Sequence, residues 1–218
     1  MIKRFVKRVF IVLLVLVTLL VAGTFIFLMS VHTSITEEAL PQEVYMNEPT
    51  SIALATAIGQ VVLADDEQKN QAIETFLNVM IFRTVRNDIN PDYDPMREDE
   101  GESQYIIKES GFILDYVIAN VLEDDIVKLT VSLKRSQFPF FSSAIYFYFD
   151  MALNPTTMSF KLTLNHVDID KMTISHQIYD WLVSRIDKEA IQASVTVGEL
   201  NLEDYTYTIN FFDEMTPF

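Results

Sequence analysis

The chain contains no cysteine among its 218 residues. Disulfides, thiolate nucleophiles and cysteine metal ligands are therefore excluded. Glycine is also scarce, with 5 in the whole chain. The sequence has neither the G-x-S-x-G turn that presents a nucleophilic serine nor a glycine-rich loop that cradles phosphate. We therefore predict a protein that is not an enzyme, with no catalytic residue and no cofactor.

A long run without charge stands near the start of the chain, from Val9 to Val31. As a helix it is about 34 Å long, enough to cross a hydrocarbon core of about 30 Å. Four basic residues between positions 3 and 8 precede the run, and Glu37 and Glu38 follow it. This asymmetry predicts a single-pass plasma-membrane anchor with a cytoplasmic N-terminus and an extracytoplasmic C-terminal part. A cleaved signal peptide is the alternative, but its apolar core is shorter and ends at a small-x-small site.

The charge of the chain is distributed unevenly. The formal net charge is −15, and residues 1–31 carry four positive charges and no acid. The remainder therefore has a net charge of −19. A nucleic-acid partner is excluded, because such binding depends on basic surface. The acidity favours solubility and repulsion from an anionic membrane face.

The sequence divides into three parts. Residues 1–31 form the basic tip and anchor, 32–50 a stalk with two prolines, and 51–218 one extracytoplasmic domain. Ser51 is placed to cap a short helix that reaches Val62, although a strand remains possible there.

A clearer amphipathic helix follows. Apolar residues recur at helical spacing from Ile73 to Val85, and the helix should end near Asn87, ahead of Asn90 and Pro91. An acidic loop, residues 88–103, comes next.

The rest of the domain alternates between apolar and polar residues, as strands with one buried face do. We expect a bend at Pro139, a bulge near Asn165 and His166, and a short helix capped by Thr173 or Ser175. The predicted fold class is α+β, with a curved antiparallel meander packed on one or two helices. The expected strands cover residues 104–108, 112–122, 126–134, 144–153, 160–169, 191–197 and 205–211.

The acidic loop has part of the spacing of a calcium-binding loop. Tyr93 stands where the sharp turn needs glycine, and Pro91 restricts the backbone. We therefore predict a solvated loop without metal, and calcium remains the alternative. The five residues of the calcium frame are Asp88, Asn90, Asp92, Asp94 and Asp99.

The histidines give no metal signature either. His166 and His176 are ten residues apart, and no pair has the i, i+4 spacing of zinc ligands on a helix. We interpret both as surface or interface residues.

Two features indicate a second apolar surface. Residues 112–122 are apolar on both faces of the expected strand, and residues 146–149 read Tyr-Phe-Tyr-Phe. Either another element covers this face or it forms a groove for an amphiphile. The residues predicted to line the apolar surface are Phe112, Leu114, Tyr116, Ile118, Phe147, Phe149, Leu162, Leu164, Ile178 and Trp181.

The order of elements over residues 112–187 resembles that of the YpmS-like proteins of Gram-positive bacteria. These have one N-terminal anchor, a helical first part, and a β-meander that leads through a short link into a helix. Asp170 replaces a glycine of the family, Thr173 and Ser175 replace common prolines, and the acidic loop and doubled final strand also depart from it. The matching positions are Ile169, Lys171, Met172, Ile174, Ile178 and Ile186.

The resemblance implies an elongated form similar to lipid-binding tubular domains, and it transfers no catalytic residue. We therefore predict an anchored domain that binds a lipid or a lipid-linked envelope molecule. The alternative is an anchored interaction module that docks a cell-envelope protein.

Overall fold

The computed structural model describes the folded domain and leaves out the N-terminal segment. The predicted anchor, residues 9–31, lies outside the described residues, as do most of the stalk, Asp99 and the expected strand 191–197. Within the described part, no helix has the length and apolar character needed to cross a membrane. The described residues are 41, 44, 50–65, 67–97, 101–135, 138–154, 157, 159–185 and 198–210.

Two antiparallel helices open the domain. α3 spans Ser51–Leu63, so this segment is a helix and the strand alternative is wrong. The Thr50 hydroxyl accepts a hydrogen bond from the Ala53 N–H, which makes Thr50 the N-cap in place of the predicted Ser51. α4 spans Lys69–Thr84 and ends in a π-helical turn, Val85–Ile89, close to the predicted end.

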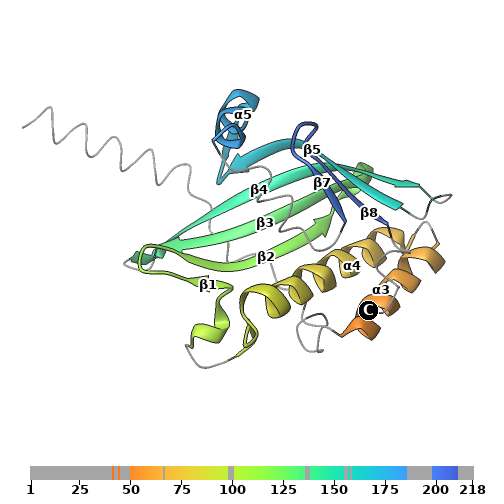
Figure 1. The fold of residues 1–218 in the computed structure, drawn as a ribbon, viewed down its shortest axis with the longest axis horizontal. Helices are drawn as coiled ribbons and strands as arrows, with labels where there is room; N and C mark the ends of the chain where they lie inside the picture. The colour runs from red at the N-terminus through yellow and green to blue at the C-terminus, as the bar shows by residue number, and fades with distance from the viewer. Residues whose placement is uncertain are drawn as a thin grey trace, which may run out of the picture.

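An antiparallel sheet follows, in the order β1-β2-β3-β4-β5-β8-β7, with β6 paired to β5. Consecutive strands pair from β1 to β6, which confirms the predicted α+β meander. The sheet curls over α3 and α4, and α5 lies on its other side (Figure 1). The strands are β1 Ile107–Lys108, β2 Ile113–Val121, β3 Ile126–Arg135, β4 Phe138–Asn154, β5 Ser159–Ile169, β6 Met172–Ile174, β7 Glu199–Asn201 and β8 Thr206–Asn210.

The expected strand bounds need correction in three places. β4 begins at Phe138 and not at residue 144; the bend expected at Pro139 coincides with a register shift, because Lys134 pairs with Ser142 and Arg135 with Phe138, which leaves residues 139–141 of β4 unpaired with β3. β1 has only two residues, because Glu102–Gln104 forms a 3-10 turn. β6 and β7 were not expected, since three residues are too few to show a period of two.

The core lies between the two helices and the inner face of the sheet. Phe76 and Phe82 from α4 and Leu54 from α3 are fully buried against sheet residues such as Val127 and Phe160. Each such side chain contributes roughly 1.5–3 kcal/mol on burial. Val44, within the predicted stalk, is also part of this core.

α4 also closes the outer edge of β2. The Asn78 side-chain amide donates to the Ala119 carbonyl (2.7 Å), and its oxygen accepts from the Ala119 N–H (2.9 Å). The Glu74 carboxylate accepts from the Val121 N–H (2.9 Å). The helix therefore supplies the hydrogen bonds that another strand would supply, and it protects an edge that could otherwise pair with a foreign chain.

One edge of β5 pairs with β4, and a bulge divides the opposite edge between two partner strands, β8 and β6. Tyr148 pairs with His166 and Phe149 with Leu164, so Asn165 is the extra residue, which confirms the predicted bulge. Before the bulge β5 pairs with β8, and after it β5 pairs with β6. α5, His176–Val183, begins directly after β6.

The link between β5 and β6 is a tight turn at Asp170. Its φ of 53° lies in the left-handed region that favours glycine. The Asp170 carboxylate accepts from the Ala144 N–H (3.0 Å), and the Asp170 N–H donates to the Ala144 carbonyl (2.8 Å). The aspartate therefore adds a bond to β4 that glycine lacks. Thr173 belongs to β6 and is not the helix cap, so Ser175 is the residue that immediately precedes α5.

This turn gives a direct stability prediction. Asp170→Ala should lower the free energy of unfolding by about 2 kcal/mol, because it loses the bond to buried Ala144 and keeps a Cβ at positive φ. Asp170→Gly should cost only about 1 kcal/mol, since it relieves the backbone. Asp125, which also has a positive φ of 56°, is the control; Asp125→Gly should be neutral or stabilising. Urea unfolding of the full chain measures all three, and an Asp170→Gly variant as stable as wild type would show that the Ala144 bond is unimportant.

Candidate functional site

Four large apolar side chains are exposed within one short segment. Ile169 and Met172 flank the β5–β6 turn and are 38% and 39% exposed. Ile178 and Trp181, three positions apart on α5, are 47% and 55% exposed. We call these four residues the β5–α5 apolar surface. Single exposed apolar residues are ordinary, but four of them within 13 residues of the sequence make this segment a candidate contact surface.

α5 is held to the domain at its polar side. The Tyr205 hydroxyl donates to the Asp180 carboxylate, which joins α5 to the turn before β8. The Arg185 guanidinium lies 5.0 Å from the centre of the Trp181 ring, in cation–π contact. Because Asp180 lies between Ile178 and Trp181 in sequence, its attachment fixes the helix while both apolar side chains stay exposed.

The exposed surface continues into the inner face of the sheet. Ile145 pairs with Ile169, which pairs with Met172, so the three share one row across β4, β5 and β6. Phe147 occupies the next row toward the core and stacks on Phe149 at 6.5 Å. Phe149 packs against the core that α3 and α4 cover, whereas Ile145 and Phe147 are half-buried beyond it. An apolar track therefore runs from the core to the exposed turn.

The ten residues predicted to line one apolar surface occupy several places. Tyr116 and Ile118 lie on the outer face of the sheet, and Ile118 and Leu162 are buried. Phe112 is exposed just before β2. Only Ile178 and Trp181 belong to the β5–α5 apolar surface. The inner face of the sheet carries Leu114, Phe147, Phe149, Leu162 and Leu164.

Ile169 and Met172 are not among the residues predicted to line the apolar surface, although both are among the positions that match the YpmS-like proteins. Their signal in the sequence is an apolar residue on each side of the polar pair Asp170-Lys171. Apolar residues that flank a turn are held at the end of a sheet, where few elements can cover them.

The outer face of the sheet is polar and aromatic. Tyr148 and His166 stack with ring centres 4.2 Å apart, and the His166 Nε2 lies 3.9 Å from the Asp168 carboxylate. The Thr130 hydroxyl and one Asp168 oxygen are buried without a hydrogen-bond partner in the described part of the chain. On this face β2 carries Ile113, Tyr116 and Ile118, and Ile113 and Ile118 are buried. The second apolar face expected of β2 is therefore covered at these two residues.

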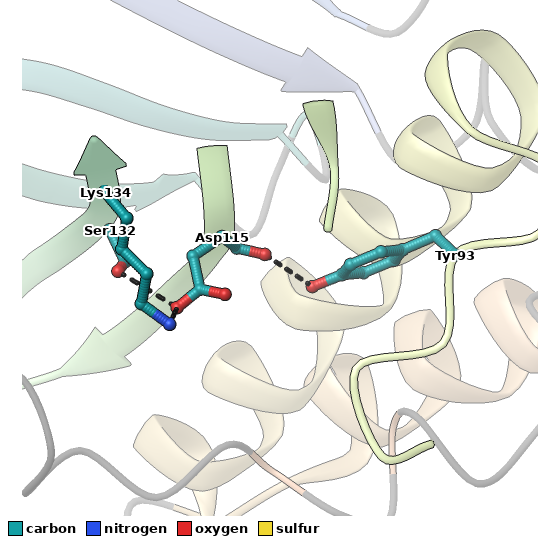
Figure 2. Close-up of polar contacts among 4 residues, drawn as sticks. All are labelled: Tyr93, Asp115, Ser132 and Lys134. Atoms are coloured by element: carbon teal, nitrogen blue, oxygen red, sulfur yellow. Dashed lines mark hydrogen bonds and ion pairs between the residues drawn. The ribbon is translucent and has the colours of Figure 1, made fainter. Parts of the chain in front are cut away.

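A bulge in β2 brings four polar residues together (Figure 2). Asp115 forms an ion pair with Lys134 (2.6 Å) and accepts a long hydrogen bond from the Ser132 hydroxyl (3.4 Å). The Tyr93 hydroxyl reaches the Asp115 carbonyl at 3.5 Å from the other side. Ser132 is only 1% exposed, so a substrate cannot reach its hydroxyl. We interpret this cluster as structural.

The acidic loop uses its polar side chains for its own turns. The side-chain oxygens of Asn90 and Asp94 accept from the N–H groups of Asp92 and Met96. Among the described residues, no group of histidine, aspartate and glutamate side chains is arranged to hold a metal ion. An open hollow of about 510 Å³ lies beside the loop. Both acidic and basic residues line this hollow, so its electrostatic potential does not favour a ligand of either charge.

No family model, curated protein or solved structure matches this chain.

Proposed function

We propose that the chain is a plasma-membrane-anchored, extracytoplasmic protein without enzymatic activity that binds a lipid or lipid-linked envelope molecule. The observation that carries the proposal is the β5–α5 apolar surface and the apolar track behind it. An acyl chain laid on this surface gains about 0.8 kcal/mol for each CH₂ removed from water.

Charge near the surface supports an amphiphile with an anionic headgroup. Lys171 is exposed between Ile169 and Met172, and Arg185 lies over Trp181. Two neighbouring acids are already engaged, Asp170 with Ala144 and Asp180 with Tyr205. In a domain whose net charge is strongly negative, these cations mark where a phosphate or carboxylate would meet least repulsion.

The proposal predicts loss of bound lipid when the surface is made polar. Native mass spectrometry of the full chain, released from detergent, should show a retained lipid in the wild type. The double variant Ile178→Gln, Trp181→Gln should bind that lipid roughly tenfold more weakly, since it loses at least about 1.4 kcal/mol of apolar contact. The matched control is Ile89→Gln, Leu122→Gln, at two exposed apolar residues elsewhere, and it should retain lipid as the wild type does.

Other outcomes of the same experiment favour other functions. A wild-type chain that retains no lipid, together with a co-purifying envelope protein lost in the double variant, would favour the interaction module. Equal loss in the double variant and the control would mean that the lipid is held elsewhere in the chain.

A further inference from the structure

The outer face of α3 is apolar and carries no charge. Ile52 and Leu63 are 75% and 85% exposed, and Val62 and Ala55 are exposed beside them. We call these four residues the α3 patch. No residue among the 13 of α3 is ionisable. A helix that is apolar on most sides normally lies buried, so this exposed face needs a partner.

The surface without charge extends from α3 across a groove onto α4, and the nearest acids are the exposed Asp65 and Glu67 in the link between the two helices. An open groove of about 640 Å³ lies between the two helices, and none of its lining residues is ionisable. The whole chain contains 31 acidic residues, so a surface of this extent without charge is an exception on the domain. The groove is lined by Thr56, Gly59, Gln60, Leu63, Ala64, Gln68, Gln71, Ala72 and Thr75.

We propose that the α3 patch rests on the surface of the bilayer in which the chain is anchored. The inference depends on the proposed anchor at residues 9–31. Only residues 32–50 separate that anchor from α3, a span of at most about 65 Å. Such a tether keeps α3 at a high effective concentration near the membrane, so a weak contact is enough.

Electrostatics selects this face. The part of the chain outside the membrane has a net charge of −19, and membranes that contain anionic lipid repel it. The domain is repelled least when its charge-free face turns toward the headgroups. Insertion of Ile52 and Leu63 between the headgroups then adds apolar burial, as in other interfacial helices.

A second copy of the chain is a poorer occupant. A helix of 13 residues is about 20 Å long and about 10 Å wide, so its outer face covers roughly 200–300 Å². A stable interface buries about 800 Å² on each partner. The α3 patch is too small for that, whereas a bilayer contact supported by a tether has no such threshold.

The contact also orients the proposed ligand surface. α3 and α5 lie on opposite sides of the sheet (Figure 1). With the α3 patch on the bilayer, α5 is held away from the anchoring membrane, whereas Ile169 and Met172 lie on the face of the sheet that also packs on α3 and α4. A lipid-linked molecule would therefore reach α5 from the envelope side.

Brominated lipids test the contact, because the chain has a single tryptophan, Trp181. In a Trp181→Phe background, Leu63→Trp places the only tryptophan on the α3 patch. Ile89→Trp is the matched control, since Ile89 is also exposed but lies in the turn beyond the far end of α4, where both acidic and basic residues are close by. The full-length variants are reconstituted in phosphatidylcholine–phosphatidylglycerol liposomes with or without acyl-chain bromine. Fluorescence at position 63 should fall at least threefold more than at position 89.

A second variant tests the electrostatic reason. Ile52→Glu in the Leu63→Trp chain should roughly halve the quenching in anionic liposomes and change it less in pure phosphatidylcholine. The added glutamate stands in the first turn of α3, where a negative charge favours the helix, so the fold should be kept.

The outcomes separate the contact from the anchor. Chains that float with liposomes but show equal quenching at positions 63 and 89 would overturn the bilayer contact and leave the anchor intact. Chains that do not float would overturn the anchor and this inference with it. A dimer mass with protection of position 63 in detergent would assign the α3 patch to a second copy and overturn the inference.

Discussion

Replacement of Asn78 by leucine should lower the free energy of unfolding by about 4 kcal/mol. Leucine has the same number and branching of side-chain heavy atoms as asparagine and is somewhat larger, so the variant leaves no cavity and removes mainly the paired hydrogen bonds to Ala119. Both Asn78 and Ala119 are 1% exposed. Water therefore cannot replace the lost bonds, and each unsatisfied backbone group costs about 1–3 kcal/mol. Chemical unfolding of the full chain measures the loss.

Two further variants identify the cause. Asn78→Asp keeps an acceptor for the Ala119 N–H but cannot donate to the carbonyl while ionised, so it should be at least as destabilising as leucine. Asn87→Ala, at an exposed asparagine beyond α4, should change stability by less than about 0.5 kcal/mol. If the free energy of unfolding of Asn78→Leu stays within about 1 kcal/mol of the wild-type value, the Asn78–Ala119 hydrogen bonds contribute little to holding α4 against β2.

Local periodicity predicted the elements well where each had one buried face. The alternation in β3 and the later part of β4 matched the strands, and the parity change in β5 located the bulge at Asn165. The part played by Asn78 could not be predicted in this way. An asparagine among apolar helix positions indicates only a buried polar group, and its partner lies 41 residues away on a strand edge.

The candidate site was harder to predict, because alternation shows which residues share a face but not what covers that face. Phe147, Phe149 and Leu162 do share the inner face, yet α3 and α4 bury one end of it and leave the other end half-open. Ile178 and Trp181 were found because helical spacing places them together. Whether an element covered them depended on tertiary contacts, which the spacing does not contain.

The two ends of the inner face therefore have different roles in the proposed function. At one end, α4 fills the curl of the sheet and seals β2, which makes this half rigid. At the other end, β6 is three residues long and α5 touches the sheet region through the Asp180–Tyr205 bond. Binding of an amphiphile at this lightly packed end would cost little rearrangement of the core, because Ile169 and Met172 are already exposed.

The last large effect is expected at Tyr93, in the acidic loop. Tyr93→Ala should lower the free energy of unfolding by about 3–5 kcal/mol, the usual range for truncation of a buried aromatic residue. The ring is 1% exposed and packs against Phe82, with ring centres 6.1 Å apart. For a domain of this size the thermal midpoint should fall by roughly 10 °C, measured by scanning fluorimetry of the full chain.

Tyr93→Phe is the graded control, since it keeps the ring and removes only the hydroxyl. Its bond to the Asp115 carbonyl is long, at 3.5 Å, so this variant should lose no more than about 1 kcal/mol. The contrast also bears on the calcium alternative, in which Tyr93 occupies the glycine position of a metal loop. A buried aromatic residue there anchors the loop to the core, and this anchoring explains the tyrosine without a metal. Equal stability of Tyr93→Ala and wild type would contradict that explanation.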